Sequence, residues 1–372
     1  MNAKQKVQEI LALADIELNG PDPWDLQVHN DHFYQRVLSH GSMGLGESYM
    51  DGWWDVSQLD EFFSKIQKAE LHDKVRTFSV VWLAAKGKLL NRQTKWSSRR
   101  VARQHYDLGN ELYRVMLDKN MQYTCAYWSG TKDLDEAQEN KLHLICRKLY
   151  LRPGMKVLEL GCGFGGLARF MAKEYGCEVV SYNISGEQMR FAREFCAGLP
   201  VRFEEKDYRE AAREPGQFDR IAAVGLCEHI GPKNHRSFLE LARSKLKDGG
   251  LFLLHTIGAS RTLTHTDPWC DKYIFSGAVI PSMPQLAAAM HELWVMEDWH
   301  NFGPDYDKTL MAWWKNFDCR YCTLDKRKYD KRFYRMWKLY LLMSAGAFRA
   351  RRLQLWQIVL SKGNAEGYVP VR

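Results

Sequence analysis

The sequence lacks any long hydrophobic run. Its longest apolar stretch, around Phe78–Ala85, is far shorter than the ~20 residues that a helix needs to cross a bilayer. The first ten residues also lack a basic segment followed by an apolar one, which predicts no secretory signal peptide. Any contact with a membrane is therefore expected to be peripheral.

Paired cysteine spacing is missing as well. The nine cysteines are odd in number, which indicates reduced thiols in a cytosolic protein rather than a disulfide framework. Cys319 and Cys322 form a single C-x-x-C without a second pair, so we interpret them as structural and predict no metal site.

Acidic residues are absent from Lys74 to Tyr106, although the segment holds nine lysines and arginines. Large apolar residues, among them Trp82 and Trp96, alternate with this charge. A basic amphipathic segment of this kind is typical of contact with an anionic bilayer. Nucleic acid could use the same charge, and a solvated helix with a linker is the plainer alternative. The net charge of +8 favours an anionic partner in either case.

The most informative stretch is Lys156–Gly166, K-V-L-E-L-G-C-G-F-G-G. It reads as a short buried strand, a glycine turn and the start of a helix, an arrangement that cradles a nucleotide-like cofactor. Gly161, Gly163 and Gly165 allow the sharp turn and a close backbone approach. The spacing of Gly161, Gly163 and Gly166 also satisfies the dinucleotide pattern, and a tight turn without a ligand is the plain alternative.

Two features favour S-adenosylmethionine (SAM) over a nicotinamide cofactor. Glu159 precedes the first glycine by two residues, where it could meet the cationic methionine end of SAM. The next predicted strand, Glu178–Asn183, ends without a carboxylate to hold a nicotinamide ribose. Gln188 is the nearer candidate for the ribose hydroxyls.

The pattern after the glycine turn alternates strands with helices, which predicts a parallel sheet covered on both faces. The expected strands are Lys156–Leu160, Glu178–Asn183, Val201–Glu205, Phe218–Gly225, Leu251–Thr256, Val295–His300 and Leu355–Ser361. Tyr306–Arg352 reads as a helical insertion rich in Trp and Arg. Before the sheet, helices are expected near residues 4–18 and 59–68, and the glycine-aromatic run Gly41–Trp54 reads as a tightly packed turn.

Ligands of such sheets bind beyond the carboxyl ends of the strands. This rule selects Glu228 and His255 on adjacent strand ends, and Asp207 and Tyr208 beside an adenine. For each residue alone, a helix cap or a satisfied core histidine is an equally good reading.

Nine segments carry a family resemblance that covers nearly the whole chain. They are Gly44–Gly52, His105–Asn110, Gln122–Trp128, Glu159–Gly165, Glu228–Asn234, His255–Gly258, Asp298–Phe302, Tyr306–Trp313 and Ala345–Arg351. Together they resemble the bacterial cyclopropane-fatty-acyl-phospholipid synthases, a family similar to the mycolic acid cyclopropane synthases. The resemblance implies an α/β fold with the Rossmann-like seven-stranded sheet of SAM-dependent methyltransferases. It also implies a smaller, mainly helical, lipid-engaging domain over 1–95, and a catalytic domain over 96–372 with a helical insertion near 306–352.

The resemblance further implies methylene transfer from SAM to the cis double bond of an unsaturated phospholipid acyl chain. A carbocation forms, and bound bicarbonate takes its proton. The bicarbonate would be held by Cys125, Glu228, His255, the Ile257 backbone and Tyr306. The residues expected to bind SAM are Tyr123, Thr124, Glu159, Gly161, Gly163, Asn183, Gln188, Asp207 and Tyr208. The aromatic faces of Tyr127, Trp128 and Phe302 are our own hypothesis for stabilising the cation.

The partners implied are anionic membrane phospholipids with unsaturated acyl chains and a second copy of the chain, without nucleic acid. The expected location is cytoplasmic, peripherally at the inner membrane. Relatives giving methyl-branched or hydroxylated chains remain an alternative, as does a SAM-binding membrane protein without turnover. Three positions depart from the usual family residues: Ser344 replaces a frequent Cys, Asn183 a Thr and Phe164 a Trp.

Overall fold

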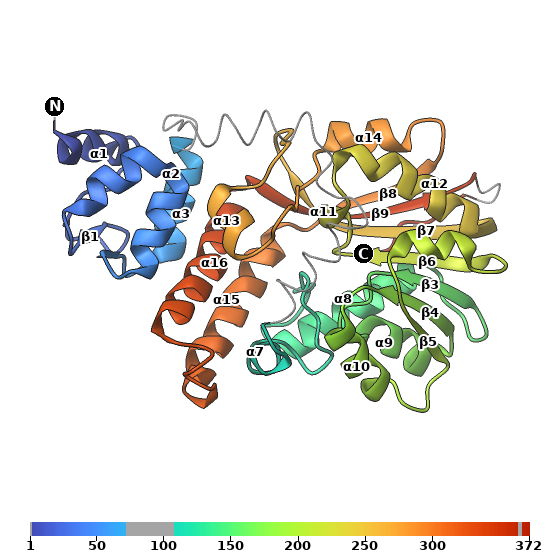
Figure 1. Cartoon of the computed structure of the whole chain (residues 1–372). Coiled ribbons are helices and arrows are strands. Elements are labelled where there is room, and N and C mark those ends of the chain that lie inside the picture. The colour runs from blue at the N-terminus through green and yellow to red at the C-terminus, as the bar shows by residue number, and fades with distance from the viewer. Residues whose placement is uncertain (1, 72–107, 364–366) are drawn as a thin grey trace. The chain divides into compact units, whose positions relative to one another are not determined.

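The computed structural model describes residues 2–71, 108–363 and 367–372 (Figure 1). The chain forms two compact units. We call the first the helical unit; its described residues are those up to 71, Thr264–Gly277 and Tyr306–Leu353. The second, the sheet unit, comprises the described residues from 108 to 263, Ala278–Asp305 and Gln354–Arg372. The basic segment Lys74–Tyr106 and the predicted domain boundary near 95 lie outside the described residues.

The sheet unit is built on seven strands in the order β5-β4-β3-β6-β7-β9-β8. Their bounds are β3 Lys156–Leu160, β4 Glu178–Asn183, β5 Val201–Glu205, β6 Phe218–Val224, β7 Leu246–Ala259, β8 Val295–Asn301 and β9 Leu353–Ser361. The pairs β3–β4, β3–β6, β4–β5 and β6–β7 are parallel, whereas β8 and β9 are antiparallel. This arrangement confirms the α/β fold class predicted from the sequence.

Strand β7 is longer than expected. It begins at Leu246 rather than Leu251, so the strand also contains the residues Lys247–Gly250. The pairing moves from Phe218 opposite Leu246 to Arg220 opposite Leu251, which makes an irregularity where β7 carries the extra residues. Gly249, at φ +71°, supplies the left-handed backbone that such an irregularity needs.

Helices cover both faces of the sheet, as Figure 1 shows. The helices of this unit are α7 Asn110–Met116, α8 Leu134–Lys148, α9 Gly166–Tyr175, α10 Gly186–Phe195, α11 Cys227–Ile230, α12 His235–Lys245 and α14 Met283–Met290, with the 3₁₀ turns η1 Tyr208–Arg213 and η2 Pro232–Asn234. One core cluster joins Phe238 and Leu286 to the sheet, and a second joins Leu142 and Met171 to it. The two clusters fix the strand ends that carry the candidate site.

The helical unit brings N-terminal helices against the helices that the sequence places in an insertion. Its elements are α1 Ala3–Ala12, α2 His32–Met50, α3 Leu59–Lys68, α13 Pro268–Tyr273, α15 Pro304–Arg320, η3 Tyr321–Thr323, α16 Lys331–Arg349 and a two-stranded ladder of β1 Gln27–Val28 and β2 Trp54–Asp55. Arg349 of α16 forms ion pairs with Asp60 of α3 at 2.7 Å and with Asp307 of α15 at 3.0 Å. A Cβ at Gly346 would lie 2.6 Å from the Asp60 carbonyl oxygen, so α16 and α3 pack at close range.

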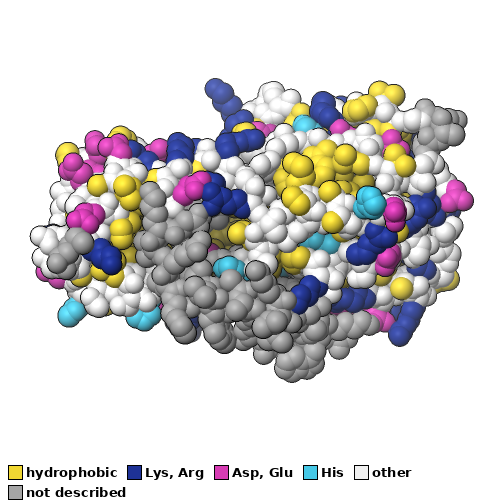
Figure 2. Space-filling model, turned by 90° about the horizontal axis from the view of Figure 1, so that it is seen from above, with side chains coloured by type: hydrophobic (Ala, Val, Ile, Leu, Met, Phe, Trp, Pro, Cys, Tyr) yellow, Lys and Arg dark blue, Asp and Glu magenta, His cyan; other side chains and the backbone are white. Residues whose placement is uncertain are grey.

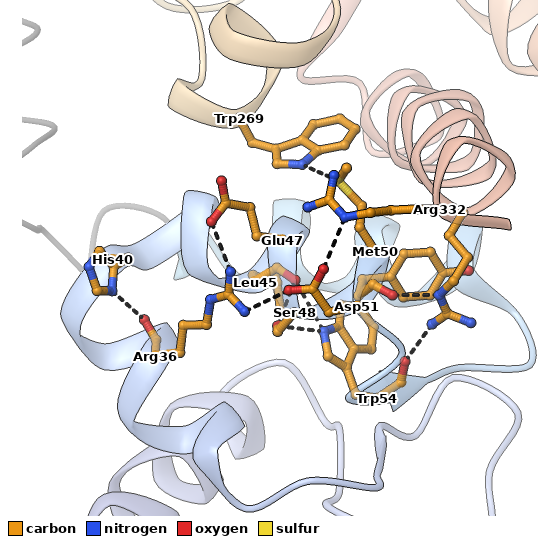
Figure 3. Close-up of polar contacts among 12 residues, drawn as sticks. Arg36, His40, Leu45, Glu47, Ser48, Met50, Asp51, Trp54, Trp269 and Arg332 are labelled. Carbon is orange, nitrogen blue, oxygen red and sulfur yellow. Dashed lines mark hydrogen bonds and ion pairs between the residues drawn. The ribbon is translucent and has the colours of Figure 1, made fainter. Parts of the chain in front are cut away.

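The prediction of a turn over Gly41–Trp54 is wrong in part, because residues 41–50 continue α2. Gly41, at φ 56° and ψ −131°, is the one kink in that helix. Gly46 is required for packing, since a Cβ there would lie 2.3 Å from Cδ1 of Trp269. Arg36 spans the kink and pairs with Glu47 and Asp51, both at 2.9 Å (Figure 3). Close packing against α13 thus offsets the low helix propensity of these glycines.

No helix in the described ranges is long and apolar enough to cross a bilayer. Some large hydrophobic side chains of the sheet unit are nevertheless exposed, namely Leu263, Met283, Val295, Met296 and Val369. Figure 2 shows hydrophobic side chains gathered in a patch on the face seen from above.

Candidate active site

The glycine turn between β3 and α9 has the backbone that the sequence predicts. Gly161, Gly163 and Gly165 all have positive φ, at 86°, 52° and 82°. A Cβ at Gly165 would come within 2.9 Å of Ala192, so this glycine serves helix packing. A Cβ at Gly163 would meet nothing within 4 Å. The backbone at Gly163 is therefore open to the approach of a ligand.

Three of the predicted SAM-binding side chains gather beside this turn. The Asn183 side-chain nitrogen donates to the Gly163 carbonyl at 3.1 Å and to Oε1 of Gln188 at 2.9 Å. Glu159 is buried, and its Oε2 accepts from Ser181 Oγ at 2.7 Å. Burial raises the pKa of Glu159 to about 7, against the opposing effects of Ser181 and Lys141. A cationic group bound here would restore the ionised carboxylate.

Asp207 and Tyr208 follow β5, as predicted. The Asp207 carboxylate accepts hydrogen bonds from the backbone N–H of Arg209 and from its guanidinium, both at 2.9 Å. The Tyr208 ring packs edge-on against Phe238, and the Arg209 guanidinium lies 4.7 Å from its centre. Their expected contact with an adenine stays a prediction.

The sequence reasoning missed a buried lysine. Lys141 of α8 is fully buried, and its Nζ donates to Oε1 of Gln122 at 2.6 Å and to Oγ1 of Thr124 at 2.9 Å. Burial lowers the pKa of Lys141 to about 8, opposed by the negative charge of Asp118. Lys141 lies four residues from both Ala137 and Ile145, which are also buried, so the helical period places it on the inward face of α8.

Asp118 stabilises the segment around Gln122 and Thr124, to which the Lys141 side chain donates hydrogen bonds. Its two carboxylate oxygens accept from the backbone N–H groups of Asn120 and Gln122, each at 2.8 Å. Burial raises the pKa of Asp118 to about 6. A Cβ on Gly166 would overlap the Asn120 carbonyl oxygen, so this segment lies directly against the start of α9. Tyr123, Thr124 and Cys125, all predicted site residues, therefore lie beside the glycine turn.

Glu228 lies in α11, just beyond the carboxyl end of β6. Its Oε1 accepts from the backbone N–H of Ile257 at 2.7 Å, which joins two of the predicted site residues. Its Oε2 is buried and has no hydrogen-bond partner among the residues that the structure describes. Burial raises the pKa of Glu228 to about 7, and the Ile257 N–H opposes this shift.

His255 faces the neighbouring strand β9. Val224 of β6 pairs with His255 of β7, so His255 lies on the strand next to the one that leads to Glu228. Its Nδ1 is 3.3 Å from the side-chain nitrogen of Gln357, and its Nε2 is buried without a partner in the described part of the chain. Burial, with the positive charges of Lys141 and Lys148, holds the pKa of His255 well below its usual range. The imidazole is therefore neutral at neutral pH.

The aromatic ring of Phe302 packs against this histidine. Phe302 lies edge-on to His255 at 6.0 Å and to Tyr127 at 5.3 Å between ring centres. The backbone N–H of Trp128 donates to Asp305 at 2.9 Å. Two of the three hypothesised cation-stabilising rings thus lie together, next to His255.

Cys125 and Tyr306 complete the predicted catalytic set. Cys125 is fully buried, and its thiol donates to the Ala126 carbonyl at 3.2 Å. Tyr306 belongs to the helical unit, where its ring lies 4.5 Å from that of Phe348. The roles of both residues at the site stay predictions.

The donor set suits a small polar ligand. An unpaired buried polar atom costs about 1–3 kcal/mol, so the unpartnered atoms of Glu228 and His255 indicate a binding position. The described residues include no cluster of three or more His, Cys, Asp or Glu side chains that could hold a metal ion. The Glu228 carboxylate can accept one hydrogen bond and the neutral His255 imidazole can donate another, so the pair suits a small ligand that both donates and accepts.

Comparison with known proteins places these residues in a family. Residues 93–358 match the family model of mycolic acid cyclopropane synthetase. The chain is 48% identical over 360 residues to the cyclopropane-fatty-acyl-phospholipid synthase of Escherichia coli K12, covering 96% of this chain and 93% of that protein. It is 30% identical to the tuberculostearic acid methyltransferase UfaA1 of Mycobacterium tuberculosis, covering 90% and 82%.

A solved structure shares the fold. The mycolic acid cyclopropane synthase CmaA1, solved with SAH and CTAB, is 26% identical, with a TM-score of 0.65 over 71% of this chain and 98% of that one.

Proposed function

Because the chain belongs to the mycolic acid cyclopropane synthetase family, we propose that it transfers a methylene group from SAM to the cis double bond of an unsaturated phospholipid acyl chain. The product is a cyclopropane ring. The observation that carries the proposal is the pair of buried, unpartnered atoms, Oε2 of Glu228 and Nε2 of His255, on adjacent strand ends of a methyltransferase sheet.

The chemistry explains why the site is buried. The SAM methyl carbon bonds to one alkene carbon while its bond to sulfur breaks, which leaves a cation on the other alkene carbon. The new methyl then loses a proton to bicarbonate, and its C–H electron pair closes the ring. A weakly nucleophilic alkene needs its partner held in line and away from water.

Different residues of this chain hold the bicarbonate, bind SAM and stabilise the cation. Glu228, His255, Ile257, Cys125 and Tyr306 hold the bicarbonate. The ionised Glu228 accepts from its O–H, and His255 donates to one of its oxygens. The SAM-binding residues are Tyr123, Thr124, Glu159, Gly161, Gly163, Asn183, Gln188, Asp207 and Tyr208. Tyr127, Trp128 and Phe302 stabilise the cation through their ring faces.

The proposed partners follow from the substrate. Anionic phospholipid membranes suit the net charge of +8, and the enzyme acts at their surface as a peripheral protein. Residues 1–95 form a lipid-engaging domain, and two copies of the chain assemble so that both can bind one membrane.

Turnover on liposomes tests the proposal. The protein is incubated with SAM and vesicles of an anionic, monounsaturated phospholipid, with and without added bicarbonate, and the acyl chains are analysed by mass spectrometry. We expect a gain of one CH₂ with loss of the alkene, stimulated by bicarbonate. An unchanged lipid despite SAM binding would overturn the proposal.

A second possible product, a methyl-branched or hydroxylated acyl chain, also has specific support. UfaA1, at 30% identity, is a methyltransferase whose name specifies tuberculostearic acid. A methyl-branched or hydroxylated acyl chain as the product would keep methyl transfer to the alkene and exclude ring closure.

A further inference from the structure

We propose that Gln357 is a positioning residue that fixes the tautomer of His255, with the proton on Nε2. This inference rests on the proposed function for its consequence in catalysis, and on the contact between Gln357 and the buried His255 for the tautomer. Gln357 belongs to β9, which neighbours β7 in the sheet, and it is fully buried.

The hydrogen bond between Gln357 and His255 determines which ring nitrogen carries the proton. The side-chain nitrogen of Gln357 lies 3.3 Å from Nδ1 of His255. An amide NH₂ group can only donate, so with the Gln357 amide in this orientation Nδ1 accepts and carries no proton, while the Gln357 Oε1 is buried without a partner among the described residues. A neutral imidazole has one ring proton, which is then on Nε2.

The surroundings keep the ring neutral. His255 is 1% exposed, and Phe302 packs edge-on against it. The charges that act on it, those of Lys141 and Lys148, are both positive and disfavour a second ring proton. The single proton therefore decides whether Nε2 donates or accepts.

The position of the ring proton decides whether His255 attracts or repels an anion. Nε2 has no partner among the described residues, so it is available to a ligand. With its proton on Nε2, His255 donates to an anion such as bicarbonate. With the proton on Nδ1, the same atom would turn a lone pair toward the anion and repel it. Gln357 thus acts through His255, as an outer partner of a ligating histidine does in metal sites.

Two substitutions separate the alternatives. Gln357→Leu removes the donor, and Gln357→Glu offers a carboxylate that accepts a hydrogen bond from Nδ1–H. We expect kcat to fall about 10- to 100-fold in both, by analogy with outer partners of metal ligands, with the KM for SAM unchanged. The matched control is Gln354→Leu on the same strand, whose side chain bonds to Asn301 and Ser260 rather than to the site. It should keep wild-type kcat.

Nitrogen NMR of the ¹⁵N-histidine-labelled protein tests the tautomer without any turnover. The His255 signals are identified by their loss in His255→Gln. We expect the wild type to show a protonated Nε2 and an unprotonated Nδ1, and Gln357→Glu to reverse this pattern. A wild-type ring with its proton on Nδ1 would overturn the inference, even if the two Gln357 variants do not fold. Absence of lipid turnover in the wild type would instead count against the proposed function alone.

Discussion

The ammonium group of Lys141 lies 2.9 Å from the hydroxyl oxygen of Thr124, inside the sheet unit. Because an ammonium group can only donate, the Thr124 hydroxyl accepts this bond and directs its own proton elsewhere. Lys141 thereby makes Thr124 a donor toward a ligand and places a buried positive charge behind it. This suits an anionic group of a ligand, and Thr124 is one of the residues proposed to bind SAM.

Replacing Lys141 by Met should therefore weaken SAM binding. We expect the Kd measured by calorimetry to rise about tenfold or more, since a charge-assisted interaction of about 1.5–3 kcal/mol is lost. Lys156→Met is the control, because Lys156 is exposed and its ammonium group lies 3.8 Å from the Glu178 carboxylate. Equal SAM affinity in Lys141→Met and the wild type would refute this role.

Glu228→Gln should abolish turnover while leaving SAM binding intact. The amide oxygen can still accept from Ile257, but the charge that receives the bicarbonate O–H is gone. We expect kcat to fall by about 10²–10⁴, with the SAM Kd unchanged. Glu240→Gln, which alters an exposed pair with Arg236, provides the control. Near-normal turnover in Glu228→Gln would remove Glu228 from the site.

The unliganded protein should be stabilised at alkaline pH by Glu159→Gln. The pKa of Glu159 is raised from 4.5 to about 7, so the folded state binds more protons than the unfolded state between these values. Stability is therefore lost as the pH rises from 4.5 to 7, because a buried carboxylate must ionise.

The thermal melts that check this need two pH values. At pH 8 the Tm of Glu159→Gln should exceed that of the wild type, and at pH 4 the two should agree. SAM affinity should fall in the same variant. Equal melting temperatures at both pH values would mean that the pKa of Glu159 is not raised.

Gly46→Ala should destabilise the helical unit. The added methyl would lie 2.3 Å from Trp269 and force α2 away from α13. Overpacking of this kind costs about 1–3 kcal/mol, which chemical denaturation can measure. Ser39→Ala, at an exposed position of the same helix, should change stability by less than about 0.5 kcal/mol. A neutral Gly46→Ala variant would show that this contact adapts freely.

Features that depend on neighbouring residues could be predicted from the sequence. The strands β4 and β5 have the predicted bounds, and Gly161 and Gly163 have the expected backbone, because periodicity and glycine spacing are local signals. The position of Glu228 beyond a strand end could also be predicted from the sequence, since the carboxyl ends of parallel strands meet on one edge of the sheet.

What the sequence could not predict depends on partners distant in the chain. The glycine run of α2 was misread because Trp269, the residue that requires Gly46, lies in another segment. Gln357 reaches His255 only because β9 is placed next to β7, and strand order does not follow from periodicity. Lys141 was missed because lysine is rarely buried, although its helical position marked it.

The most direct test of the proposed reaction follows the methyl hydrogens. With SAM carrying a fully deuterated methyl group and monounsaturated anionic liposomes, the acyl product is analysed by mass spectrometry. Ring formation predicts a saturated-ring product that retains two of the three deuterium atoms, and this product should be absent in Glu228→Gln. A product that retains all three deuterium atoms would contradict deprotonation and ring closure, and with it the role proposed for Glu228 and His255.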